Sequence, residues 1–297
     1  MLTLKRTWIL LLLILTACSG GTSNFPTILA SPTPLPATST PLPPTATPIP
    51  MAIMVNNDGM TVDEFNAELA RYKVAMTGLG KTISAEQALQ TVRGDMINQL
   101  LLVQGASEAG FALDASALQQ RLDTLISKIG GTDKLAAWQQ INNYTAASFN
   151  DALKRAAAGA WMRDKIMSAV PSTTEQVHVR QILLYNEDVA KSYFEQLKTG
   201  ADFDELAAQV DPVTRGDIGW FPRGYLAEKA VEDAAFSLEV GTYSAIVQGE
   251  VGFHIIKLLD RQADRGLSPD ALSTLQSHAI IDWLSTRQQQ SKIVITP

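Results

Sequence analysis

The spacing of apolar residues changes near residue 177, and this change predicts two regions with different secondary structure. Between residues 51 and 170, apolar side chains recur three and four residues apart, as they do along one face of an α-helix. The segment 177–184 (VHVRQILL) is instead rich in β-branched residues and partly alternates, which predicts a β-strand. We therefore expect a helical region followed by a region in which strands and helices are mixed.

A proline-rich stretch precedes the helical region. Residues 20–50 contain nine of the 14 prolines of the chain, interleaved with Thr, Ser and Ala. Proline lacks a backbone N–H, and this composition offers little apolar surface to bury, so the stretch should stay extended and solvated. It is typical of a stalk between an anchor and a folded body. A ligand for a domain that binds proline-rich motifs is a weaker alternative, because those domains are mainly intracellular.

The N-terminus has the pattern of an export signal. Lys5 and Arg6 precede an apolar stretch, residues 7–16, that is too short for a comfortable membrane span. Small residues then lead to Cys18, the single cysteine, in a sequence (LTAC) that resembles the bacterial lipobox. The resemblance implies a signal peptide over residues 1–17, a lipid on Cys18 and an extracytoplasmic protein held at a membrane. An ordinary signal peptide or an uncleaved anchor, with an incidental cysteine, is the alternative.

Charge and composition exclude some kinds of partner. The formal net charge is −6, whereas a nucleic-acid-binding protein needs a basic face that releases counterions from the phosphates. The three histidines (His178, His254 and His278) are far apart in the sequence, and one cysteine cannot form a CxxC pair. We expect no nucleic acid, no metal and no cofactor.

Capping patterns mark the starts of helices in residues 51–170. Thr61 is followed three residues later by Glu64, and Ser84 by Gln87, which are capping boxes. Further helices are predicted over residues 115–129, 133–140 and 146–167, after a short apolar run at 52–55 and a turn at 56–59. This region contains no recognisable catalytic constellation.

The region after residue 177 has a compact α+β order. A strand (177–184) is followed by predicted helices at 187–197 and 202–209, a turn-rich stretch at 211–224 and a helix at 231–236. Two strands, 243–247 and 253–259, should then form a hairpin.

This ordered set of segments resembles the parvulin-type peptidyl-prolyl isomerases. The segments that carry the resemblance are residues 179–183 (VRQIL), 200–203 (GADF), 216–221 (GDIGWF), 234–238 (AAFSL) and 252–256 (GFHII). The helical region and the capped segment after Val55-Asn56 are similar to the chaperone part of the PrsA and SurA group. In that group a C-terminal segment often returns to the helical part, and residues 268–290, with apolar positions at helical spacing, would supply it here.

The resemblance implies an α+β protein in which a helical chaperone body carries an inserted parvulin-like domain, a small antiparallel sheet surrounded by helices. The expected boundaries are 18–50 for the lipidated cysteine and linker, 51–170 for the helical domain, 175–262 for the parvulin-type domain and 263–297 for the returning helix.

Parvulins are understood to use two histidines on adjacent strands and a Cys or Asp in a loop. The resemblance places the second histidine at His254 and the first at Gln181, which can hydrogen-bond but cannot share a proton as an imidazole does. The loop acid matches Asp211. The residues themselves leave alternatives open, because a lone histidine on an apolar strand is commonly structural and Asp211 could simply cap the turn at Pro212.

The resemblance also implies an apolar pocket for the proline ring. Its positions fall on Leu226 and Val231, where valine replaces the expected aromatic residue, and on Phe236. Trp220 either frames the rim of this pocket or only packs against its neighbours. The other three could be buried core residues whether or not a proline binds.

The resulting functional prediction is a membrane-anchored foldase that isomerises X-Pro bonds in unfolded exported proteins. The alternative is a holdase without catalysis, in which a degenerate parvulin domain serves as a platform for client chains. Gln181 and Val231 favour the alternative.

Overall fold

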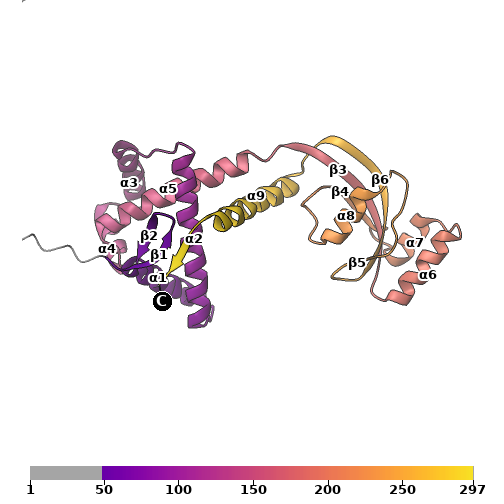
Figure 1. The fold of residues 1–297 in the computed structure, drawn as a ribbon, viewed down its shortest axis with the longest axis horizontal. Helices are drawn as coiled ribbons and strands as arrows, with labels where there is room; N and C mark the ends of the chain where they lie inside the picture. Colours follow the sequence, from indigo (N-terminus) through magenta and orange to yellow (C-terminus); the bar gives the residue numbers. More distant parts are fainter. Residues whose placement is uncertain (1–48, 297) are drawn as a thin grey trace, which may run out of the picture. The chain divides into compact units, whose positions relative to one another are not determined.

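The computed structural model describes residues 49–296. The predicted signal peptide, Cys18 and residues 20–48 of the proline-rich stretch lie outside the described residues. Residues 49–296 belong to one unit of the chain, in which two small sheets are separated along the chain by helices (Figure 1).

The first sheet combines segments from both ends of the described chain. Its strands are β1 (Met51–Val55), β2 (Asp58–Thr61) and β7 (Ile293–Ile295), in the order β2-β1-β7. The predicted turn at residues 56–59 is a hairpin between β1 and β2, with Asn56 in the left-handed region at a φ of 56°. The side chain of Gln104 donates to the Val55 carbonyl at 2.8 Å and to the Asp58 carboxylate at 2.9 Å, which fixes this turn.

Helices cover this sheet and build the larger part of the unit. They are α1 (Val62–Gly78), α2 (Ala85–Glu108), α3 (Ala115–Ile129), α4 (Thr132–Ile141) and α5 (Ala146–Ser168). Both predicted capping boxes are confirmed, since the Thr61 and Ser84 side chains each accept from the backbone three residues on, and Glu64 and Gln87 return the bond. Each cap satisfies backbone donors that the first helical turn leaves free.

The last helix, α9 (Pro269–Gln290), packs against α2 and α5. Its N-cap is Ser268, the residue at which the sequence predicted this segment to begin, and proline occupies the first turn, where its missing N–H is not needed. The Trp283 side chain of α9 contributes to two apolar clusters, one shared with β1 and α2 and the other with α2 and α5. The helix thereby closes the core of the helical region.

The second sheet has the strand order β4-β3-β6-β5. Its strands are β3 (Thr173–Leu184), β4 (Asp217–Pro222), β5 (Val247–Gln248) and β6 (Phe253–Gly266), all in antiparallel pairs. The central strands β3 and β6 are both longer than the sequence predicted. The predicted strand at 243–247 is wrong over most of its length, because Tyr243 forms only an isolated bridge with Lys257. The sequence predicted only a turn-rich stretch where β4 lies, and Gly219 within this strand has a φ of 79°.

Helices cover both faces of the second sheet. On one face α8 (Lys229–Ser237) packs on β3 and β6, and on the other lie α6 (Glu187–Lys198) and α7 (Phe203–Val210). The alternation of side chains along the strands divides the core in two. Val177, Val179 and Ile256 face α8, whereas Ile182 and Ile255 face α6 and α7. The predicted α+β class, with a small antiparallel sheet among helices, is confirmed.

A pair of glycines in α2 tests how closely α9 is packed. A Cβ atom on Gly105 would lie 2.6 Å from Trp283 Cζ2, whereas a Cβ on Gly94 would meet nothing within 4 Å. Gly105→Ala should therefore lower the free energy of unfolding by about 1–3 kcal/mol through overpacking. Gly94→Ala should be neutral or raise it by up to about 1 kcal/mol, because alanine favours the helix. Urea unfolding of both variants measures this, and equal effects would contradict the close packing of Trp283.

Candidate functional site

A hydrogen-bonded pair, His254 and Gln181, lies at the centre of the candidate site. His254 is on β6 and Gln181 on β3, and the register that sets Leu183 opposite His254 brings both onto the face covered by α8. His254 Nδ1 and Gln181 Oε1 are 2.8 Å apart. Because an amide oxygen only accepts, Nδ1 carries the proton in this arrangement. The structure thus joins two residues that the sequence placed 73 positions apart.

The other ring nitrogen of His254 has no hydrogen-bond partner in the described part of the chain. Nε2 is buried, since the side chain is 4% exposed, and the Glu228 carboxylate Oε2 lies 3.9 Å away. Burial lowers the pKa of His254 below its usual value of 6.5, and the negative charge of Glu228 acts in the opposite direction. A Cβ on Gly249 would lie 2.0 Å from Glu228 Oε2 and 2.8 Å from Nε2, so only glycine leaves room for this approach.

Glu228 was missed by sequence reasoning. It is the N-cap residue of α8, and its carboxylate accepts from the backbone N–H groups of Glu250 at 2.8 Å and Val251 at 3.2 Å. These donors come from the turn between β5 and β6, and they fix the carboxylate beside His254. An acidic residue at a helix start is common, so the sequence carries no signal that Glu228 also contacts the turn between β5 and β6.

Gln181 also lines a cavity of about 290 Å³. Gln181 and Leu183 line it from β3, and Asp211 and Pro212 line it from the loop that follows α7. Two of the three predicted catalytic residues, Gln181 and Asp211, therefore face one cavity. The third, His254, is in contact with it through Gln181.

The Asp211 carboxylate accepts hydrogen bonds from its own loop. It accepts from the backbone N–H groups of Val213 at 3.0 Å and Thr214 at 3.1 Å, and from the Thr214 hydroxyl. The bonds from Thr214 hold the pKa of Asp211 below its usual value of 3.8. In this arrangement the carboxylate shapes the loop, which is the alternative that the sequence left open, and the loop in turn forms one wall of the cavity.

The predicted proline-pocket residues divide into two kinds. Val231 and Phe236 are only 2% and 5% exposed and pack with Val177 and Phe221 in the core under α8. Leu226 is half-buried at the edge of the same cluster. Leu226 is therefore the member of this set with surface available for a ligand, while the other two support it from below.

A second glutamate of α8 holds the loop that carries Leu226. The Glu232 carboxylate is buried, 5% exposed, and accepts from the backbone N–H groups of Gly224 at 2.8 Å, Tyr225 at 3.0 Å and Leu226 at 3.2 Å. Glu228 and Glu232 are one helical turn apart, so α8 fixes two loops with two carboxylates. A buried glutamate is unusual unless paired, but its exposure cannot be deduced from the sequence.

Trp220 does not lie with the predicted pocket residues. In the register of β3 and β4 it is opposite His178, and its neighbour Phe221 points into the α8 core. Adjacent residues of a strand point to opposite faces, so Trp220 points away from α8. There its ring stacks on His178 with centroids 5.4 Å apart, and the Arg265 guanidinium lies 4.3 Å from its centroid. The packing role that the sequence left open fits this position.

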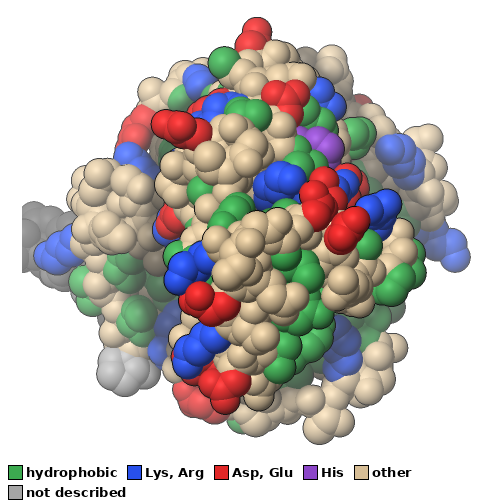
Figure 2. Space-filling view, turned by 90° about the vertical axis from the view of Figure 1, so that its right-hand side faces the viewer, with side chains coloured by type: hydrophobic (Ala, Val, Ile, Leu, Met, Phe, Trp, Pro, Cys, Tyr) green, Lys and Arg blue, Asp and Glu red, His purple; other side chains and the backbone are tan. Residues whose placement is uncertain are grey.

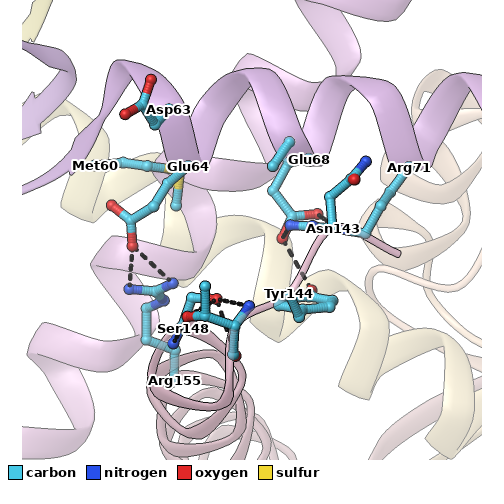
Figure 3. Close-up of a pocket in the computed structure, with 11 residues that line it drawn as sticks. Met60, Asp63, Glu64, Glu68, Arg71, Asn143, Tyr144, Ser148 and Arg155 are labelled. Carbon is cyan, nitrogen blue, oxygen red and sulfur yellow. Dashed lines mark hydrogen bonds and ion pairs between the residues drawn. The ribbon is translucent and has the colours of Figure 1, made fainter. Parts of the chain in front are cut away.

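A second cavity, about 210 Å³, lies in the helical region between α1 and α5 (Figure 3). Arg155 reaches Glu64 at 3.3 Å across it, and the Tyr144 hydroxyl donates to Glu68 at 3.3 Å. The Arg71 guanidinium lies 3.9 Å from the centre of the Tyr144 ring and pairs with Glu68. The Arg155–Glu64 pair joins α5 to α1, whereas the Arg71–Glu68 pair lies within α1. This arrangement joins α1 to α5 and offers no catalytic chemistry.

Residues 49–296 present neither an extended basic patch on the face shown in Figure 2 nor a cluster of metal-ligating side chains. Acidic and basic side chains are interleaved with hydrophobic ones on the face shown in Figure 2, without an extended basic patch. No group of three or more His, Cys, Asp or Glu side chains in these residues could hold a metal ion. Among the same residues, no helix has the length and hydrophobicity needed to cross a membrane.

Comparison with known proteins agrees with the geometry of the second sheet. Residues 172–260 match the rotamase family, described as the PPIC-type PPIASE domain. The chain is 32% identical over 126 residues to the foldase protein PrsA of Oceanobacillus iheyensis, which covers 40% of this chain and 42% of that protein. It is 35% identical over 91 residues to the periplasmic chaperone PpiD of Haemophilus influenzae, covering 29% of this chain and 14% of that protein.

The chain thus aligns with less than half the length of these two relatives. Among solved structures, the peptidylprolyl isomerase PrsA from Bacillus cereus is similar with a TM-score of 0.43 and 24% identity, covering 78% of this chain and 82% of that one. The chain contains a PPIC-type peptidyl-prolyl isomerase domain and has PrsA foldases among its homologues.

Neighbouring acids of α8 provide a matched test of the loop that carries Leu226. Glu232→Ala leaves three backbone N–H groups without their acceptor and should lower the free energy of unfolding by about 1–3 kcal/mol. Asp233→Ala removes only exposed pairs with Lys229 and Arg223 and should leave it nearly unchanged. Thermal and urea unfolding provide the comparison. A Glu232→Ala variant as stable as Asp233→Ala would show that its carboxylate does not hold the loop.

Proposed function

We propose that this chain, which carries a PPIC-type domain in residues 172–260, catalyses cis–trans isomerisation of X-Pro bonds in unfolded proteins outside the cytoplasm. The observation that carries the proposal is the Gln181–His254 hydrogen bond at the wall of a cavity that Asp211 also lines. Its homologues include proteins named foldase and periplasmic chaperone, which supports a role on exported chains.

The reaction needs a shaped and partly dry site rather than a covalent step. Rotation about the X-Pro bond is slow because it breaks amide resonance, at a barrier of about 18–20 kcal/mol. In the twisted transition state the proline nitrogen regains a lone pair and becomes basic, while the carbonyl becomes less polar. A donor placed near that nitrogen therefore binds the transition state better than the planar amide.

The cavity beside Gln181 contains the parts that such a site requires. Leu183, Val210 and Pro212 supply apolar walls that can exclude water from a proline ring. The Gln181 amide oxygen is engaged by His254, so its NH₂ group is the donor available to the substrate. Asp211 acts on the substrate indirectly, by holding the loop that carries Pro212.

The helical region is proposed to hold unfolded client chains. We retain the division into a helical part (51–170), an inserted isomerase part (175–262) and a returning segment (263–297). The packing of α9 on α2 and α5 supports this division, since it ties the chain after the insert to the helices before it.

The membrane anchor is proposed from the sequence alone, because Cys18 lies outside the described residues. The lipobox-like LTAC sequence and the proline-rich segment that follows support a lipid on Cys18 and an extracytoplasmic location. Mass spectrometry of the mature N-terminus tests this proposal. An N-terminus other than Cys18, or a Cys18 without a lipid, would overturn it.

A second function is favoured by specific observations. Gln181 replaces an imidazole, and Val231 and Phe236 are buried in the core rather than open to a ligand. These features favour a holdase that uses the parvulin-like domain only to bind clients.

An isomerase assay decides between these two functions. Residues 48–297 should accelerate the isomerisation of a proline peptide above the uncatalysed rate, in a protease-coupled measurement. His254→Asn should lower kcat/KM by on the order of tenfold, because Gln181 loses the group that orients it. His178→Asn, on the opposite face of the sheet, is the matched control and should retain the rate. No rate above background, with aggregation of an unfolded client still suppressed, would refute the enzyme and favour the holdase.

A further inference from the structure

One ring nitrogen of His254, Nε2, is buried beside a carboxylate. Nε2 is buried without a hydrogen-bond partner among the described residues, and the Glu228 carboxylate faces it at 3.9 Å. If the ring were neutral with its proton on Nδ1, a lone pair on Nε2 would face a negative charge in a buried space. That arrangement is repulsive and leaves a polar atom unsatisfied. A proton on Nε2 turns this repulsion into attraction, as an ion pair at 3.9 Å.

We propose that Glu228 is a positioning residue that keeps a proton on His254 Nε2 and thereby decides which end of the Gln181 amide faces the cavity. The proposal rests on the function proposed above for the Gln181–His254 site. Glu228 lies outside the set of site residues predicted from the sequence.

Two forms of the pair follow from the donors and acceptors present. When both ring nitrogens are protonated, Nδ1–H donates to Gln181 Oε1 and Nε2–H faces Glu228, and the Gln181 NH₂ group points to the cavity. When the ring loses a proton to water, Glu228 favours loss from Nδ1 rather than Nε2. The Gln181 amide then turns to donate to Nδ1, and its carbonyl oxygen faces the cavity instead.

Only the first form offers the substrate a donor. The proline nitrogen of a twisted X-Pro bond accepts a hydrogen bond, so the protonated pair stabilises the transition state and the neutral pair does not. Catalysis should therefore increase as the pH falls through the titration of His254. Without the Glu228 charge, the neutral ring no longer prefers its proton on Nε2. Nδ1–H and the Gln181 donor can then persist above the titration of His254, so the rate should depend less on pH.

The surroundings of His254 leave Glu228 as the charge that faces the ring. Strands β3 and β5 present Gln181, Leu183 and Val247 to it, which are uncharged. The Glu250 side chain is exposed, and only its backbone N–H is directed at Glu228. Lys229, beside Glu228, is paired with Asp233. In the described residues no other carboxylate pairs with the His254 ring.

A histidine titration by NMR tests the proposal without requiring turnover. The sample is residues 48–297 labelled in histidine and glutamine, with the His254 signals assigned by their loss in His254→Asn. Glu228→Gln keeps an oxygen that can accept from the turn but removes the charge. It should lower the pKa of His254 by about 0.5–2 units, the range expected for a partly screened charge at this separation.

Glu232→Gln is the matched control. It lies one turn further along α8, also holds a loop, and is not a partner of His254. It should leave the His254 titration unchanged, and melting curves show whether each variant is folded. In the unsubstituted protein the Gln181 side-chain amide signals should shift in step with His254. An unchanged titration in folded Glu228→Gln, or equal shifts in both variants, would overturn the proposal.

The isomerase rate separates this proposal from the proposed function. A rate that follows the His254 titration, and becomes less dependent on pH in Glu228→Gln, supports both. No rate at any pH, together with the expected titration shift, refutes the isomerase while the assignment of the proton stands. A rate that is independent of the His254 titration supports the isomerase and overturns the role of Glu228.

Discussion

The antiparallel ladder between β3 and β6 is the constraint on which the candidate site depends. Its register sets Leu183 opposite His254 and so brings Gln181 within hydrogen-bond distance of the ring. A shift by one residue would turn every side chain of one strand to the opposite face. Gln181 would then leave the α8 face, and Ile182 would leave the core it shares with α6 and α7. Because both faces are buried, the packing of apolar side chains fixes the geometry of the polar pair.

Helix α8 packs on this sheet and holds two loops beside it. Its buried apolar positions, Val231 and Phe236, attach it to the sheet, and its two glutamates hold the loops on either side. A carboxylate that receives several backbone N–H groups replaces the water those groups would otherwise need. The site is therefore shaped by charged residues that do not touch the proposed substrate.

The sequence predicted those parts of the structure that depend on local patterns. The capping boxes at Thr61 and Ser84 and the start of α9 at Ser268 involve residues three positions apart, and all three are present. His254, Gln181 and Asp211 were found through an ordered resemblance to a family, and the structure brings Gln181 into contact with His254 and, with Asp211, to one cavity.

The parts that the sequence did not predict depend on contacts between distant residues. Glu228 meets the turn at Glu250 across 22 positions, and nothing local distinguishes it from other acids at helix starts. Strand β4 lacks a continuous alternating pattern because Gly219 interrupts it. Trp220 was grouped with the pocket by its place in a motif, but its orientation follows from the pairing of β4 with β3, which sets it on the other face. Its aromatic character was equally compatible with either side.

The pairing of β1 with β7 has a consequence for the order in which the chain acquires its structure. Ile53 pairs with Ile295, so β1 can pair early with its neighbour β2 but with β7 only after residues 293–295 have been synthesised. Contacts of such long sequence separation form slowly, whereas the β3–β6 region between them closes a shorter loop. The inserted sheet should therefore be able to fold while the helical part is still incomplete. A nascent chain that has not yet reached residue 293 would therefore carry a finished isomerase-like domain and an unfinished body around it.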